Sequence, residues 1–445
     1  MSLRHKIAGL ALSLSLVVGG TQALADNQEM FTELENAAQS SRELELLEPL
    51  NIEVKTREQL QQEQLDSMET DFPVDDTADW TQVLVFLGYL EEGDNIAEIY
   101  SGLMGSQILG YYDPTTGDLV IVSTSEDDWG ATDRSTFVHE TVHALQDQHY
   151  DLMEIQGADL VYTDDLYFAR TALIEGDATT AEIIYLVEND LVDQLLEESE
   201  EFDSSAVDEA PFFLSETLYF PYNEGAEFVM FFWTEGGWEA VDEVWQNPPT
   251  TSEQILHPEK YVDGEGAVPV AIADPLHTFG DEWRMLEYNE NGELGVRVFL
   301  ENGGASHRDA TNASEGWGGD ATYIITNDEE TAMVWNTAWD TEDDAIEFFD
   351  TLQESEGERT GAEFEDVDDN TVRFEGGGYV GFIQRDGENV IYYLAESQDT
   401  IDTLMESQED APIPGEKPSP EPIEATPEDA DATPAASIQF WTRKN

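Results

Sequence analysis

Hydrophobic spacing divides the chain into a long helical part and a shorter part rich in strands. Apolar residues recur at helical spacing from Trp80 to Leu103, which predicts one or two helices in the core. The segment from Leu166 to Leu196 is predicted to form one long helix. From about residue 263 the sequence pattern changes to short runs of β-forming residues separated by turns. We expect strands at 322–326, 331–338, 372–375, 379–385 and 390–394, and helices at 341–353 and 398–405.

A β-hairpin is predicted just before the middle of the helical part. Two β-rich runs, Ile108–Tyr112 and Leu119–Val122, flank a turn that contains Pro114 and Gly117. An edge strand at this place has free backbone groups that can pair with an extended peptide. Plain scaffolding explains the hairpin equally well.

The predicted fold class is α+β, with a mainly helical domain and a small sheet over residues 81–262. A smaller antiparallel α+β domain follows at 263–406. Residues 26–80 are expected to form a helical arm. The sequence does not decide whether this arm is a propeptide, an inhibitory lid or a segment that packs permanently on the domain. The tail, 407–445, is rich in Pro, Glu and Ala and is expected to be disordered.

Residues 1–25 have the layout of a secretory signal peptide. Arg4 and Lys6 precede an apolar run over 7–19, and Ala23-Leu24-Ala25 offers a small-x-small cleavage site. That run is too short to cross a bilayer securely, so we expect no stable membrane span in the mature chain. The expected location is secreted, periplasmic or at the cell surface.

Composition changes the picture in two ways. The 445 residues include 99 acidic and 17 basic ones, for a formal charge of −82, and molar salt would screen the self-repulsion. We therefore expect a protein from a halophile, and nucleic acid is excluded as a partner because no basic patch exists. Since the chain has no cysteine, any metal must be held by histidine and carboxylate side chains.

The strongest chemical signal is His139-Glu140-Thr141-Val142-His143. No glycine or proline interrupts residues 133–150, so a helix with Thr132 or Asp133 as N-cap is expected. At about 100° per residue, His139 and His143 share one face and can grip one zinc ion. Glu140 lies beside that face and can act as general base toward a water.

Two histidines leave a zinc site one protein ligand short. Glu175 is the expected third ligand, because it lies amid apolar positions of a predicted helix, where a carboxylate needs a partner. We expect Gly176 to let that backbone approach the zinc helix closely. Asp177 or Asp147 would then orient a ligand imidazole.

His149 is the rival third ligand. His139, His143 and His149 have the spacing of the metzincin motif, in which a midway glycine turns the chain toward the metal. Here that midway residue is Gln146, a helix former. A continuous helix would place His149 about 120° away from His143, which disfavours it as a ligand of the same ion.

A zinc peptidase also needs a donor that stabilises the oxyanion, usually a histidine or tyrosine. The candidates are His257, Tyr261 and Tyr222. For each, a structural role in the aromatic region or in a turn that closes the domain is an equally good explanation. Helices broken at Gly236-Gly237 are expected in this region.

Four segments, spread over about residues 85–262, resemble exported gluzincin-type zinc metallopeptidases, a poorly characterised family found partly in halophiles. They are Gly110–Pro114, His139–Gln148, Glu175–Ala178 and His257–Tyr261. The resemblance implies a zincin-like domain in which His139, His143 and Glu175 bind Zn²⁺ and Glu140 is the base. Many gluzincins have an aspartate four residues after the ligand glutamate, where this chain has Thr179, which puts the orienting role in doubt.

The sequence therefore predicts a secreted zinc metallopeptidase that acts on peptide or protein substrates. Two other classes stay open. An inactive zincin-like binding protein at the cell surface would use the zinc structurally. A surface or adhesion protein without metal would carry the motif by accident.

Overall fold

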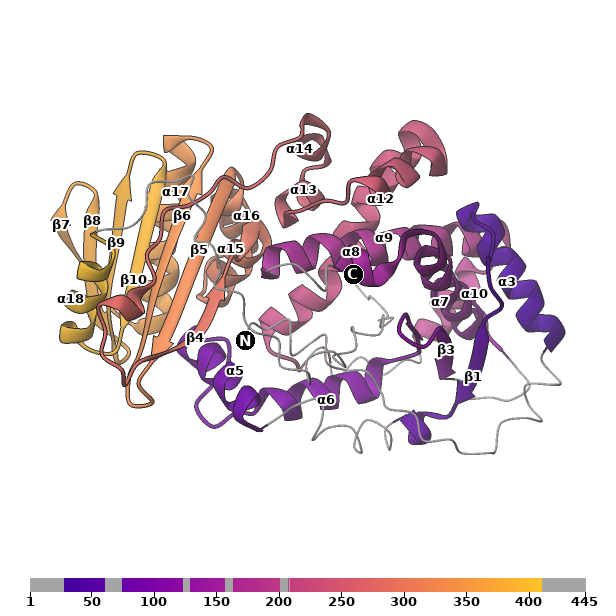
Figure 1. Ribbon diagram of the computed structural model, residues 1–445, viewed down its shortest axis with the longest axis horizontal. Coiled ribbons are helices and arrows are strands. Elements are labelled where there is room, and N and C mark those ends of the chain that lie inside the picture. Colours follow the sequence, from indigo (N-terminus) through magenta and orange to yellow (C-terminus); the bar gives the residue numbers. More distant parts are fainter. Residues whose placement is uncertain are drawn as a thin grey trace.

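The computed structural model describes residues 28–60, 74–122, 129–156, 163–200, 207 and 209–409. The predicted signal peptide and almost all of the predicted tail lie outside these described residues. Within them the chain is α+β, with a helical part that contains a three-stranded sheet and a seven-stranded antiparallel sheet at the other end (Figure 1). The predicted fold class is confirmed.

The helical part is built from α-helices that surround a small sheet. Its helices are α3 (Gln28–Arg42), α5 (Val74–Phe86), α6 (Ile96–Gln107), α7 (Ala131–Tyr150), α8 (Leu152–Gln156), α9 (Asp164–Glu188), α10 (Val192–Ser199), α12 (Phe212–Gln246), α13 (Ser252–Leu256) and α14 (Pro258–Asp263). Its strands are β1 (Asn51–Lys55), β2 (Gly110–Asp113) and β3 (Asp118–Val122). One apolar core joins these elements. None of the described helices is both long enough and apolar enough to cross a membrane.

The small sheet has the order β1-β3-β2. β2 and β3 form the predicted antiparallel hairpin, and β1 adds to β3 in parallel. The expectation of helix throughout the arm was wrong at β1. Ile52 and Val54 are β-branched residues at alternate positions, and β3 is the long-range partner that makes them a strand.

α9 and α12 cross at two glycines. A Cβ added to Gly176 would lie 2.1 Å from the carbonyl oxygen of Gly225, and one added to Gly225 would lie 2.3 Å from that of Ala172. The close approach expected at Gly176 thus exists, but it is made with α12 and not with the histidine-bearing helix. α12 has the expected break, at Gly237, where φ is 66°.

Gly176→Ala is expected to destabilise the protein by about 2–3 kcal/mol, because the new methyl group would force two helix backbones apart. Gly102→Ala is the matched control, since Gly102 is also helical and an added Cβ would meet no atom within 4 Å. Chemical denaturation in high salt measures both. A Gly176→Ala variant as stable as wild type would contradict the tight crossing.

The C-terminal part is one antiparallel sheet with helices on both faces. Its strands are β4 (Arg284–Asn289), β5 (Trp317–Thr326), β6 (Thr331–Trp339), β7 (Phe364–Asp368), β8 (Thr371–Gly376), β9 (Tyr379–Asp386) and β10 (Asn389–Ala395), in the order β4-β5-β6-β10-β9-β8-β7. The helices are η1 (Pro275–His277), α15 (Gly292–Asn302), α16 (His307–Ser314), α17 (Glu342–Thr360) and α18 (Gln398–Ser407).

Alternate residues of the central strands enter two different cores. In β6, Met333 and Trp335 pack in the core shared with α15, α16 and α17, whereas Val334 packs in the core shared with α18. Because successive side chains of a strand point to opposite faces, the sheet is buried on both faces. The strands and helices predicted here from residue 322 onward are confirmed within one or two residues at most boundaries.

Candidate metal centre

α7 carries the histidine motif and begins earlier than the sequence indicated. Gly130 is its N-cap, with no side chain to offer, so neither Thr132 nor Asp133 has the cap position that we expected. Glu198 of α10 supplies the missing acceptor, with its carboxylate 3.0 Å from the Ala131 N–H and 2.8 Å from the Thr132 N–H. A carboxylate at this end also complements the helix dipole.

His139, His143 and Glu175 converge as predicted. The Oε2 atom of Glu175 lies 3.2 Å from Nε2 of His139 and 3.3 Å from Nε2 of His143. Both histidines are fully buried and Glu175 is 4% exposed. One ligand atom from each lies within 4.8 Å of the other two, so the group could hold a metal ion.

The hydrogen bonds of His143 test whether a cation fits this group. Gln146 donates its Nε2 to the Ile174 carbonyl at 3.0 Å, so its Oε1 faces Nδ1 of His143 at 2.9 Å. Nδ1 is therefore placed to donate to Gln146, and Nε2 is directed toward Glu175. Among the described residues that Nε2 is buried without a hydrogen-bond partner. A cation between this nitrogen and the carboxylate would satisfy both, so the group fits a metal.

His139 is held from its other side by Glu182 of α9, whose Oε2 lies 3.2 Å from Nδ1. Burial lowers the pKa of His139, but the contacts with Glu175 and Glu182 outweigh it and raise that pKa to about 10. For Glu175, burial is likewise outweighed by the two histidines, which lower its pKa to about 2. The pocket thus favours positive charge between its carboxylates, the charge that a bound cation would supply.

The sequence did not identify Glu182 and Gln146, which contact the outer nitrogens of the two imidazoles. Glu182 lies seven residues after Glu175, so it projects from nearly the same face of α9, about 20° away. Its carboxylate makes the contact with a histidine of the triad that the sequence pattern would have placed at residue 179. The seven-residue spacing between Glu175 and Glu182 could have indicated this shared face. The contact with His139 also requires that α7 and α9 pack antiparallel, which the sequence does not show.

Glu182→Ala is expected to weaken metal binding by about 10–100-fold while the fold stays intact, because His139 would lose the group that fixes its ring. Glu188→Ala is the control, since Glu188 is exposed on the same helix. Competition with a chromophoric chelator in high salt measures both affinities. Equal affinities in the two variants would show that Glu182 does not orient the ligand.

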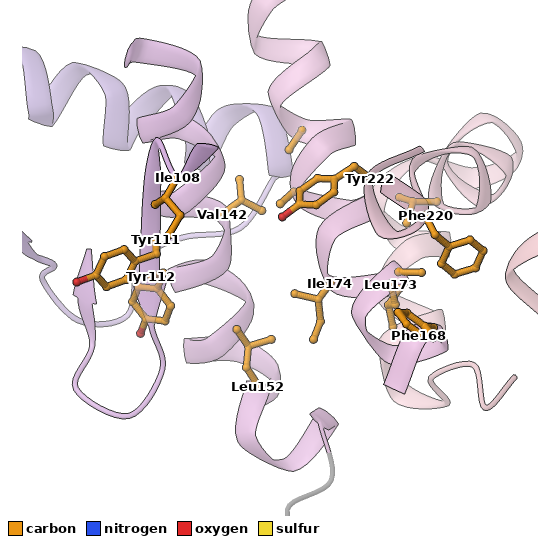
Figure 2. Packing of buried hydrophobic residues seen from close by; sticks show 14 of the residues in the cluster. Ile108, Tyr111, Tyr112, Val142, Leu152, Phe168, Leu173, Ile174, Phe220 and Tyr222 are labelled. Carbon is orange, nitrogen blue, oxygen red and sulfur yellow. The ribbon is translucent and has the colours of Figure 1, made fainter. Parts of the chain in front are cut away.

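Glu140 and Tyr222 complete the surroundings of the triad. Glu140 is fully buried, and Gly110 at the start of β2 packs against it, because a Cβ there would lie 3.1 Å from Cγ of Glu140. The Tyr222 ring stacks on His139 with centroids 6.2 Å apart. Figure 2 shows its hydroxyl directed toward the helix that carries Val142. Burial and the carboxylates of Glu175 and Glu140 hold the pKa of Tyr222 well above its usual value, so the phenol stays a donor.

His257 and Tyr261 have partners elsewhere. Nε2 of His257 lies 3.0 Å from Oε1 of Glu293 in α15, and the Tyr261 hydroxyl donates to the Asn247 carbonyl at 2.8 Å. These contacts tie α13 and α14 to their neighbours, the structural role that the sequence left open. Of the three donor candidates, Tyr222 is the one that the structure brings to the triad.

The rival ligand and the two aspartates named as orienting candidates all have partners outside the triad. α7 runs as a continuous helix to Tyr150, so His149 is directed away from the triad as expected, and its Nε2 lies 2.8 Å from the Glu45 carbonyl oxygen. Asp147 accepts from the Tyr112 hydroxyl, and Asp177 pairs with Arg42. Neither aspartate touches a ligand imidazole, so their predicted roles were wrong.

A second group of carboxylates already has a cationic side chain among its oxygens. Glu253, Glu265 and Asp340 offer oxygens within 4.8 Å of one another. Nζ of Lys260 lies among them, at 2.5, 2.8 and 2.7 Å respectively. The lysine ammonium takes the place that a cation would need.

Comparisons with known proteins cover the molecule unevenly. Residues 282–405 match the family described as "Domain of unknown function (DUF8575)"; this segment contains all seven strands of the larger sheet and lies outside the candidate metal centre. No curated protein matches the chain. One solved structure is similar, described as a "putative hydrolase with a novel fold" from Chloroflexus aurantiacus. It has 19% identity and a TM-score of 0.35, over 59% of this chain and 98% of that one.

Proposed function

We propose that the protein is a zinc-dependent hydrolase that cleaves peptide bonds. The observation that carries this proposal is the convergence of His139, His143 and Glu175, with Glu140 buried next to the first histidine. Two imidazoles and one carboxylate are the donor set of catalytic zinc sites, which keep a further position for water or substrate. Histidine and carboxylate donors in a chain without cysteine suit zinc better than softer metals.

Each side chain has a role in this proposal. A zinc ion bound there would act as a Lewis acid toward the scissile carbonyl and lower the pKa of water. Glu140 would accept the proton of the attacking water and deliver it to the leaving amine nitrogen. Tyr222, kept protonated, would donate a hydrogen bond to the oxyanion. Glu182 and Gln146 would hold the imidazoles in the required orientation.

Chelation should abolish hydrolysis reversibly. Protein purified in high salt would be treated with 1,10-phenanthroline, assayed on a fluorogenic peptide library and restored with about one equivalent of Zn²⁺. We expect activity to disappear with the metal and to return with zinc, because the triad would be emptied and refilled. A non-chelating phenanthroline isomer serves as the control. Hydrolysis that persists after complete metal removal would refute the proposal.

A structural metal is the second candidate, and the burial of the group favours it. His139, Glu140 and His143 are 0% exposed and Glu175 is 4% exposed. A buried metal would contribute to folding in the way structural zinc does. In that case chelation lowers Tm, while no peptide of the library is cleaved with or without zinc.

A further inference from the structure

α3 ends on a buried arginine that joins it to two other helices. Arg42 is 0% exposed, and its Nε lies 2.8 and 2.9 Å from the two carboxylate oxygens of Asp177 in α9. Its Nη2 lies 2.7 Å from Oδ1 of Asp242 in α12. The guanidinium is also 4.3 Å from the centre of the Trp238 ring. A guanidinium is always charged, has several donors in one plane and stacks on aromatic rings, so arginine suits a buried contact among several helices. We call this contact the junction.

The two aspartates are further tied to α7 and α12. Trp245 donates its Nε1 to Asp177 at 2.7 Å, and the Tyr150 hydroxyl donates to Asp242 at 2.7 Å. Tyr150 is the last residue of α7, and its ring stacks on Trp245. The junction therefore includes α3, α7, α9 and α12, and Asp177 lies two residues from Glu175 (Figure 1).

The rest of the N-terminal arm, residues 28–55, also packs against α7 and β3. Phe31 stacks on Phe137 with centroids 5.4 Å apart, two residues before His139. Gln148 of α7 accepts from the Leu47 and Glu48 N–H groups at 2.6 and 3.0 Å. β1 covers the edge of β3 that β2 leaves open.

We infer that the arm is a permanent part of the metal-binding domain rather than a removable propeptide or lid, and that Arg42 is a positioning residue for the turn of α9 that carries Glu175. Without the arm, the buried carboxylate of Asp177 would lose its cation, which is strongly unfavourable. β3 would also lose a neighbour strand. Loss of the arm would thus disrupt the triad instead of uncovering it. The positioning role rests on the proposed metal site, and the permanence of the arm does not.

Charge removal tests the junction. Arg42→Met should lower Tm by about 10 °C and weaken zinc binding at least about 10-fold, because Asp177 stays charged and buried. The double variant Arg42→Met with Asp177→Asn should recover more than half of the Tm loss, since no lone charge remains. Arg308→Met is the control at an exposed arginine. An Arg42→Met variant with wild-type Tm and zinc affinity would overturn the inference.

Cleavage tests the permanence of the arm. A site for a specific protease would be inserted between residues 61 and 73, and the cut protein would be passed over a sizing column in high salt. The arm should stay bound, or its loss should unfold the remaining chain and release its metal. An arm that leaves while the rest keeps its Tm and its zinc, or gains hydrolytic activity, would overturn the inference. If wild-type protein binds no zinc, the proposed function is refuted. The permanence of the arm would still be tested by the Tm and the elution position of the cut protein.

Discussion

Glu140→Gln is expected to lower kcat for peptide hydrolysis by about 10³-fold while the protein keeps its metal. The amide has nearly the shape of the carboxylate but cannot accept a proton, and general acid–base catalysis contributes about 10²–10⁴-fold. The exchange also removes a fully buried negative charge, so the fold should tolerate it.

Two comparisons make this result decisive. Glu154→Gln, at an exposed residue of α8, should leave kcat unchanged. Metal analysis of each purified variant should return the wild-type amount of zinc, which separates loss of the base from loss of the ion. If Glu140→Gln hydrolyses peptides at the wild-type rate with its zinc in place, the assignment of the general base is wrong.

Glu175→Gln is expected to weaken zinc binding by more than about 100-fold. Structural zinc sites are worth about 10–16 kcal/mol over four ligands, so one ligand accounts for roughly 3 kcal/mol, or more than two decades in affinity. A neutral amide oxygen is a much poorer zinc donor than a carboxylate. Competition with a chelator of known affinity measures the change.

The same substitution at Glu188, exposed on α9, is the control and should have no effect. Circular dichroism in high salt should also show that the variant is folded to the same extent as wild type. If Glu175→Gln binds zinc as tightly as wild type, the ion is held by other groups and the triad is not its site.

The predictions that held depend on local geometry. His139, Glu140 and His143 lie in one helix, where 3.6 residues per turn fixes their relative directions without knowledge of the fold. Glu175 was found because a carboxylate among apolar helix positions needs a partner, an argument from burial alone. The strands β5, β6 and β10 were likewise visible as short β-rich runs, since the residue types that favour strands do not depend on which strands pair.

The predictions that failed depend on how separate elements pack. Gly176 looked like a contact point with α7, but its partner is Gly225, and nothing in the spacing of α9 identifies which neighbour meets which face. Asp177 looked like an orienting residue because it is only two residues from Glu175 in sequence. Two steps along a helix rotate a side chain by about 200°, so Asp177 faces away from the triad and pairs with Arg42. β1 is a strand only because β3 is beside it.

Anomalous X-ray diffraction, recorded on both sides of the zinc absorption edge, tests the central claim most directly. Crystals of wild-type protein loaded with one equivalent of Zn²⁺ should show one strong peak, about 2.0–2.2 Å from Nε2 of His139, Nε2 of His143 and a carboxylate oxygen of Glu175. An absent peak, or one centred on Glu253, Glu265 and Asp340 instead, would contradict the account.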